Sequence, residues 1–160
     1  MAQAATRERS PGPGAKGKAD RELKLVRRLP AKPEQVFRAF ADPRRLVKWW
    51  GPKGVTIPVC EMDVRPGGRW LTTMRSSDGD MTVSGVYREI DPPSRLVFTW
   101  AWHGDGKRGH ETLVTIALKP HGAGTELTLT QGAFDSAQSL DAHRHGWSSS
   151  FDCLAEYLRG

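Results

Sequence analysis

The five histidines are the residues of this 160-residue chain that most resemble a catalytic or metal-binding set, because imidazole titrates near neutral pH and ligates metals. His143 and His145 are two residues apart, so on a helix they lie on different faces and cannot chelate together as an i,i+4 pair would. His110 precedes Glu111, but neighbours on a strand point to opposite faces. We interpret the histidines as solvated or structural, and predict no catalytic residue and no metal site.

Other motifs that carry chemistry are missing from the sequence. Cys60 and Cys153 are far apart and form no Cys-x-x-Cys pattern, which argues against a disulfide framework and a zinc site. We find no nucleophile elbow and no phosphate-binding glycine loop. We therefore predict no cofactor, and an enzyme that uses a cavity as a cyclase or hydrolase stays open only as an alternative.

The six tryptophans indicate more about function than the histidines do. An indole has an apolar body and a polar N–H, which suits the wall of a ligand cavity. The competing interpretation is an ordinary aromatic core. For the cavity, we predict ligand-binding side chains from two faces that alternation and helical spacing bring together: Trp50, Trp70, Thr72, Met74, Phe98, Trp100, Trp102, Val114, Trp147 and Phe151.

Two further features near these positions have open alternatives. Trp49 and Trp50 are adjacent, and adjacent helical residues point in different directions. We therefore expect only one of them to be deeply buried, with the other at a cavity mouth or in a plug over the core. Arg69, Arg75 and Arg88 alternate out of phase with the aromatic face, so we expect them to point to solvent. An arginine turned inward would instead fix a ligand carboxylate.

One long helix from about 136 to 159 must carry the Trp147 side of such a cavity. Its apolar residues recur at spacings of three, four or seven, the period of one helix face: Leu140, Trp147, Phe151, Leu154 and Leu158. Asp135 or Ser136 can cap its start. Gly146 is costly inside a helix, so we expect a close backbone approach or a slight bend there.

The middle of the chain alternates with a period of two, which is typical of strands. Turn residues such as Pro66-Gly67-Gly68 separate the segments, and the gaps are too short for helical crossovers, so neighbouring strands must be antiparallel. One face of the sheet is apolar and aromatic. The predicted strands are Thr56–Asp63, Gly68–Arg75, Met81–Ile90, Arg95–Trp102, Glu111–Leu118 and Thr125–Gln131.

The first third of the chain supplies one strand and two short helices. A strand begins near Leu23 and ends at Leu29-Pro30, a helix follows over Pro33–Phe40, and Asp42-Pro43 opens a second helix that Gly51-Pro52 stops. Residues 1–20 are rich in proline, glycine and charge, so we expect a disordered tail before one domain over 21–160. The predicted class is α+β, with a curved antiparallel sheet of about seven strands wrapped on the last helix.

Charge is unevenly spread along the chain. Residues 1–53 carry 14 Lys and Arg against 5 Asp and Glu, whereas residues 54–160 carry 10 against 13. Polyanion binding is one interpretation of the basic segment and a solvated face is the other. The basic residues form no recognised nucleic-acid motif, and we predict no nucleic-acid partner. No apolar run is long enough for a membrane span and no signal-peptide region is evident, so cytoplasm is the expected location.

Several local motifs, in their shared order, resemble the helix-grip fold of the START-like superfamily. Within it the chain is similar to the family of the activator of heat-shock-protein-90 ATPase C-terminal domain. The resemblance covers about Arg21 to Arg159. The matching stretches include Trp49-Trp50-Gly51-Pro52, Arg65-Pro66-Gly67-Gly68-Arg69-Trp70, Gly85-Val86-Tyr87, Pro93-Ser94-Arg95-Leu96-Val97-Phe98-Thr99-Trp100, Gly124-Thr125-Glu126-Leu127-Thr128-Leu129 and His145-Gly146-Trp147.

This resemblance implies an elongated cavity between the sheet and the last helix that holds an apolar ligand, such as a lipid, sterol or polyketide. The first hypothesis is therefore a protein that binds a small apolar or amphipathic molecule. A co-chaperone-like interaction module, with a chaperone as partner, is the alternative from another class. The name-giving activator has an additional N-terminal domain, and this chain has only the tail there.

Overall fold

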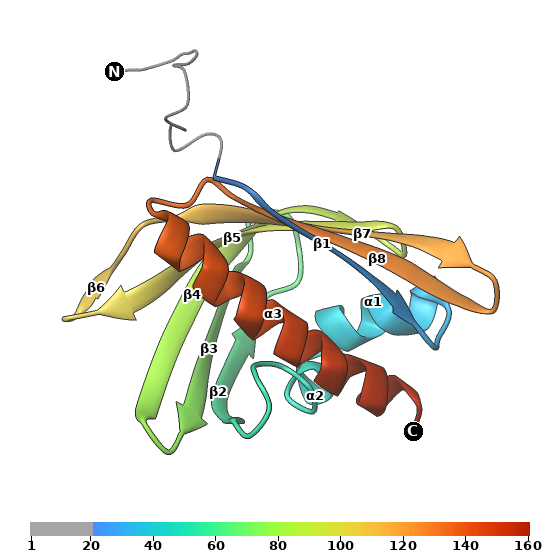
Figure 1. Ribbon diagram of the computed structural model, residues 1–160, viewed down its shortest axis with the longest axis horizontal. Helices are drawn as coiled ribbons and strands as arrows, with labels where there is room; N and C mark the ends of the chain where they lie inside the picture. Colours follow the sequence, from blue (N-terminus) through green and yellow to red (C-terminus); the bar gives the residue numbers. More distant parts are fainter. Residues whose placement is uncertain (1–20) are drawn as a thin grey trace, which may run out of the picture.

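A computed structural model describes residues 21–160, so the predicted disordered tail over 1–20 lies outside the described residues. The predicted fold class is confirmed: a curved antiparallel sheet is wrapped on a long C-terminal helix (Figure 1). In chain order the elements are β1 (Leu23–Leu29), α1 (Pro33–Ala41), α2 (Pro43–Leu46), β2 (Thr56–Met62), β3 (Arg69–Ser76), β4 (Gly79–Asp91), β5 (Arg95–Gly104), β6 (Lys107–Arg108), β7 (Thr112–His121), β8 (Gly124–Gly132) and α3 (Ala137–Leu158).

The strands follow the order β1-β8-β7-β5-β4-β3-β2, with the two-residue β6 attached to β5. All pairs are antiparallel, and the first strand joins the last, with Leu25 opposite Leu129. The short turns between strands required this arrangement from β2 to β5 and from β7 to β8. The pairing of β1 with β8 places α1 and α2 below that end of the sheet, beside the second half of α3 (Figure 1).

The sheet bends sharply between β4 and β5. Their register shifts between Tyr87 and Glu89, and such a bulge increases local twist. Gly85 lies at the same bend, where a Cβ would overlap the Thr99 carbonyl group and crowd the Trp70 indole. The glycine therefore allows the two strands to approach each other closely enough for the sheet to curve over α3.

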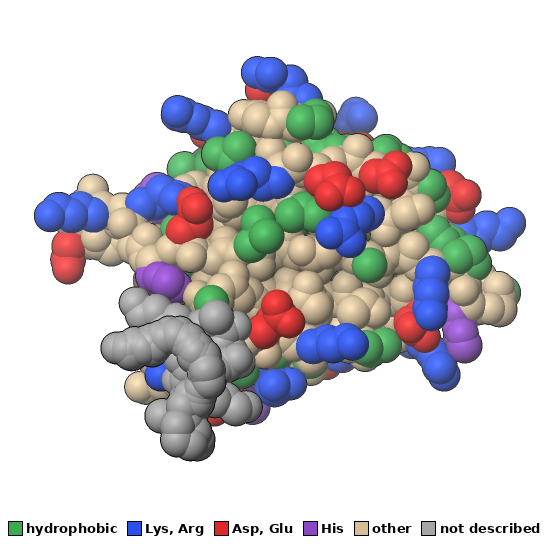
Figure 2. Space-filling model, turned by 90° about the horizontal axis from the view of Figure 1, so that it is seen from above, with side chains coloured by type: hydrophobic (Ala, Val, Ile, Leu, Met, Phe, Trp, Pro, Cys, Tyr) green, Lys and Arg blue, Asp and Glu red, His purple; other side chains and the backbone are tan. Residues whose placement is uncertain are grey.

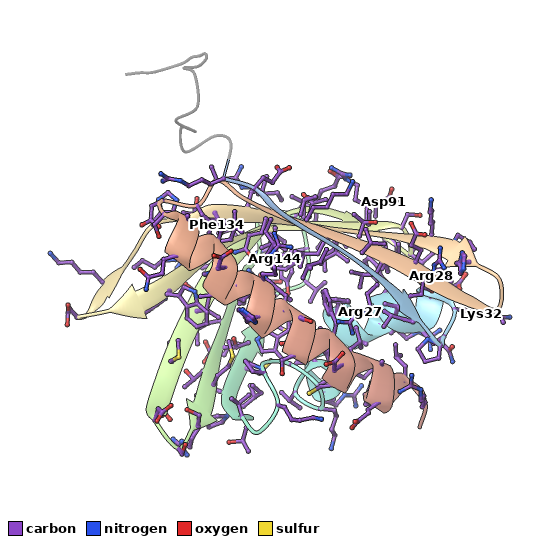
Figure 3. The ribbon with its side chains drawn as sticks, viewed as in Figure 1. Arg27, Arg28, Lys32, Asp91, Phe134 and Arg144 are labelled. Carbon is purple, nitrogen blue, oxygen red and sulfur yellow. The ribbon has the colours of Figure 1, made fainter. Side chains whose placement is uncertain are left out.

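Helix α3 lies across the inner face of the sheet. Ser136 caps it, since its hydroxyl accepts a hydrogen bond from the Ser139 backbone N–H at 3.0 Å. Its predicted apolar face points inward, with Trp147, Phe151 and Leu154 buried. Arg27 of β1, labelled in Figure 3 between β1 and α3, binds the Asp152 carboxylate of the helix at 2.7 Å.

The bounds of the strands were predicted more accurately from the sequence than those of the second helix. Each predicted strand agrees with an observed one to within three residues at either end. The second helix ends at Leu46, and a hydrogen-bonded turn carries the chain on to Trp50, whose backbone N–H donates to the Leu46 carbonyl oxygen at 2.9 Å. The strand β6 was not predicted; it pairs with the end of β5 beyond the Gly104–Gly106 turn.

The surface carries both signs of charge. Figure 2 shows Lys and Arg side chains interspersed with Asp and Glu on the face seen from above. Several basic residues of the N-terminal segment are in ion pairs, including Arg27, Arg28 and Arg45 with Asp152, Glu126 and Asp42. Within residues 21–160 no helix is long and apolar enough to cross a membrane.

Candidate functional site

A cavity of about 440 Å³ lies between the inner face of the sheet and α3. Three regions of the chain wall it: the segment after α2, strands β3 to β5, and the middle of α3. Its lining is Trp50, Gly51, Pro52, Lys53, Val55, Met74, Ser76, Met81, Trp100, Trp102, Ala142, His143, Gly146, Trp147 and Ser150. Apart from Lys53 and His143 these side chains are uncharged at any pH, so the cavity favours apolar surface.

Four tryptophans form its aromatic wall. Trp100 and Trp102 are two residues apart on β5 and so share the inner face. The ring centre of Trp100 lies 5.1 Å from that of Trp147 on α3 and 5.9 Å from that of Trp50. The planes of these two pairs are tilted by 45° and 51°, and aromatic rings at such distances stabilise one another. The indoles therefore pack as one cluster, to which α3 contributes Trp147.

Small residues on α3 leave the space that the tryptophans surround. Ala142, Gly146 and Ser150 are spaced by four, so they lie in one row along the helix, and all three line the cavity. Apart from its chain neighbours and the surrounding helix backbone, no atom lies within 4 Å of a Cβ built on Gly146. The close backbone approach predicted at Gly146 is therefore absent, and the glycine borders open space.

The cavity reaches solvent beside the β3–β4 hairpin. Its lining residues Pro52, Lys53 and Met81 are exposed, and the Met81 side chain retains 55% of its accessible surface. Large exposed apolar side chains are unusual enough to mark an opening or a contact. A ligand can thus enter between this hairpin, the loop after α2 and the row of small residues on α3.

The predicted ligand-binding residues fall into three groups in the structure. Five of the ten line the cavity, namely Trp50, Met74, Trp100, Trp102 and Trp147. Trp70, Thr72 and Phe98 surround a separate space of about 20 Å³, which holds little more than one water. Val114 and Phe151 line none of these spaces and are buried in the core.

The prediction that only one of Trp49 and Trp50 is deeply buried is wrong. Trp49 is 2% exposed and Trp50 is 5% exposed. Because α2 has already ended, the two indoles turn into different layers: Trp49 donates to the Ala39 carbonyl oxygen of α1 at 3.0 Å, and Trp50 donates to Thr72 Oγ1 of β3 at 3.1 Å. Trp50 is thus the cavity wall and Trp49 is core.

A buried glutamine that the sequence did not single out holds Trp147 in place. Gln131 of β8 is fully buried; its Oε1 accepts from Trp147 Nε1 at 2.7 Å, and its Nε2 donates to Thr112 Oγ1 at 2.8 Å. Gln131 alternates in phase with the inward-facing Leu127 and Leu129. A polar residue at an inward position of a strand was the signal that could have found it.

His143 also connects α3 to the aromatic wall. Its Nδ1 lies 2.7 Å from the Ser139 carbonyl oxygen, which only a protonated Nδ1 can satisfy, and its Nε2 accepts from Trp102 Nε1 at 2.9 Å. Desolvation by burial lowers the pKa of His143 below its ordinary value, against the smaller opposing effects of the Ser139 bond and Asp135. The ring is thus a neutral structural bridge, as the sequence interpretation allowed.

The predicted arginines do not enter the cavity. Arg69, Arg75 and Arg88 are exposed, and Arg75 pairs with Asp80 at 2.9 Å. Within residues 21–160, no three or more His, Cys, Asp or Glu side chains are grouped so that they could hold a metal ion. The arrangement provides an apolar, aromatic binding space with few polar groups, which can bind and orient an apolar molecule.

Comparisons with known proteins agree with this architecture. The family described as activator of Hsp90 ATPase homolog 1-like protein matches residues 30–159. The crystal structure of the AHSA1 protein from Silicibacter pomeroyi is 32% identical, with a TM-score of 0.78, and the match covers 86% of this chain and 97% of that one. A protein from Chromobacterium violaceum is likewise 32% identical with a TM-score of 0.78, covering 85% and 95%. A protein from Nitrosomonas europaea is 28% identical with a TM-score of 0.75, covering 88% and 96%. No curated protein matches the chain.

Proposed function

Because the chain belongs to the family of activator of Hsp90 ATPase homolog 1-like proteins, we propose that it uses the START-like fold to bind a small apolar or amphipathic molecule between the sheet and α3. The observation that carries this proposal is the cavity of about 440 Å³ walled by four tryptophans. This volume falls within the roughly 300–1,000 Å³ of typical small-molecule sites.

The chemistry of the lining supports an apolar ligand body. Burial of apolar surface supplies most of the affinity in such a site, at about 25 cal/mol per Å². Indoles add flat faces for rings, and the methionines Met74 and Met81 adapt to irregular shapes. Lys53, the one lysine or arginine of the lining, is exposed at the opening.

Filling the cavity from α3 tests this proposal. A Gly146→Leu side chain has open space before it, so it would occupy the cavity without a backbone clash, and it removes a helix-interior glycine that costs about 1 kcal/mol. The readout is the affinity for 1-anilinonaphthalene-8-sulfonate, measured by dye emission. His145→Leu is the matched control, because it introduces the same side chain at the adjacent exposed position of the same helix.

We expect wild type and His145→Leu to bind the dye alike. Gly146→Leu should bind it at least about tenfold more weakly, with a thermal midpoint equal to or above that of wild type. Undiminished dye binding by a folded Gly146→Leu variant would refute the assignment of the cavity. If the wild type binds no apolar probe at all, a chaperone-interaction module becomes the better explanation, and binding to purified Hsp90 is the measurement to make.

A further inference from the structure

A second, more polar compartment of about 150 Å³ adjoins the main cavity near the start of α3. Trp100, Trp102 and His143 line both spaces. Their ring centres lie 5.4 to 6.1 Å apart, so the three rings form one shared wall. Phe134, labelled beside the start of α3 in Figure 3, also lines the compartment, and its ring centre lies 4.8 Å from that of His143.

The compartment differs in chemistry from the main cavity. Its other lining residues include His110, Thr112, Asp135 and Ser139, and neither Lys nor Arg lines it. The guanidinium of Arg21 lies outside the lining and donates to the Asp135 backbone carbonyl oxygen at 2.6 Å. A carboxylate that entered the compartment would thus meet the Asp135 carboxylate and find no ion-pair partner in the lining. The lining therefore suits an uncharged polar group better than an anionic one.

The hydrogen bonds already formed around the compartment leave one donor atom that such a polar group could bind. Both nitrogens of His143 are already bonded, to Ser139 and Trp102, and the Thr112 hydroxyl accepts from Gln131. Among residues 21–160, Trp100 Nε1 is the buried side-chain polar atom that has no partner. The Trp100 side chain is 5% exposed. A buried donor without an acceptor is costly, so a ligand oxygen that reached this indole would remove that cost.

We propose that the ligand is amphipathic and carries a neutral hydroxyl group, which accepts a hydrogen bond from Trp100 Nε1 in the polar compartment while its apolar body fills the main cavity. A hydroxyl group both accepts from the indole and donates to an oxygen of the compartment. Trp100 Nε1 is buried, so in this proposal the hydroxyl group reaches it by displacing the partly buried side chains of Trp102 and His143. This inference rests on the function proposed above.

Three matched probes test the head group on the full chain: naphthalene, 2-naphthol and 2-naphthoate, with dissociation constants from isothermal titration calorimetry at neutral pH. A hydroxyl group is better hydrated than hydrocarbon, so without a protein partner naphthol binds more weakly than naphthalene. We expect the opposite: naphthol about three- to tenfold tighter than naphthalene, as one net hydrogen bond provides, and naphthoate weakest.

Trp100→Phe removes the donor and keeps an aromatic ring. The quantity compared is the ratio of naphthalene to naphthol dissociation constants, which cancels any general loss of affinity. We expect this ratio to fall to one or below in Trp100→Phe. Trp49→Phe is the control, because Trp49 is buried away from the cavity and its N–H is already bonded to Ala39, and its ratio should equal that of wild type.

If Trp100→Phe does not fold, an NMR measurement on the wild-type protein tests the same hydrogen bond. With ¹⁵N-labelled tryptophan, the Trp100 indole proton should move downfield with naphthol and not with naphthalene. Naphthol binding no tighter than naphthalene, or naphthoate binding tightest, would overturn the hydroxyl assignment while leaving the apolar cavity intact. If none of the three probes binds, both this inference and the proposed function fail.

Discussion

Replacing Gln131 with leucine should destabilise the fold although leucine suits a buried strand position better. Gln131 is fully buried and bonds to Trp147 Nε1 at 2.7 Å and to Thr112 Oγ1 at 2.8 Å. Leucine has a similar volume, so Gln131→Leu creates little cavity and the effect comes from hydrogen bonding. It leaves the Trp147 indole N–H, on a side chain that is itself buried, without an acceptor.

The magnitude follows from that unpaired donor. An unsatisfied buried group costs about 1–3 kcal/mol, and the apolar gain of leucine offsets part of it. The Thr112 hydroxyl keeps its long bond to the Trp100 carbonyl oxygen at 3.4 Å and so contributes less. We expect a net loss of about 2 kcal/mol in unfolding free energy, or about 4–8 °C in the thermal midpoint for a domain of this size.

A double-mutant cycle with Trp147→Phe separates this cause from general damage. Phenylalanine removes the donor, so in the Trp147→Phe background the Gln131→Leu change should cost about 1 kcal/mol less than in wild type. Guanidinium unfolding followed by circular dichroism gives all four free energies, provided that each transition is two-state. An equal cost in both backgrounds would show that the Gln131–Trp147 bond does not hold the helix on the sheet.

Three further predictions concern core, backbone and pH, each read from the unfolding free energy. Leu154→Ala should cost about 2–5 kcal/mol, the usual range for a fully buried leucine, because Leu154 has no exposed surface and lines no cavity. Gly85→Ala should largely prevent folding, since its Cβ overlaps the Thr99 carbonyl group, whereas Gly146→Ala should stabilise by about 1 kcal/mol because its Cβ meets nothing. Burial lowers the pKa of His143 below 6.5; the unfolded chain therefore takes up this proton first, and stability present above about pH 6.5 is lost as the pH falls. His143→Phe should lose less stability than wild type between about pH 7.5 and pH 5.5; an identical loss would assign the pH dependence to other groups.

The pattern of apolar and polar residues within single segments was sufficient to predict most of the fold. The period-two segments and their turns predicted the antiparallel strands from β2 to β8 except the two-residue β6, because alternation in a strand follows directly from its geometry. The stripe of Trp147, Phe151 and Leu154 likewise predicted the buried face of α3. These are properties of single segments, and they need no knowledge of what the segment contacts.

The site depended on contacts between segments and was predicted only in part. Trp49 and Trp50 were expected to differ in burial, yet both are buried, because the early end of α2 sends one ring to α1 and the other to β3. The partners of Trp102 and Trp147 come from 41 and 16 residues away. A hydrogen bond over such separations is fixed by topology and register, which a one-dimensional pattern does not contain.

The arrangement of α3 favours the proposed binding cavity over an ordinary aromatic core. A helix that only covered a core would carry large side chains wherever it faces the sheet, because empty space forfeits dispersion contacts and destabilises the fold. At Ala142, Gly146 and Ser150 the helix instead lines the cavity with small residues, and Gly146, whose Cβ would meet open space, also weakens the helix. The helix thus gives up packing and helix stability at Gly146, in the same cavity wall as Trp100, whose buried indole N–H has no partner in the described chain. Local rules that fail together at one place are expected at a functional site, and an amphipathic ligand would compensate for both the missing contacts and the missing acceptor.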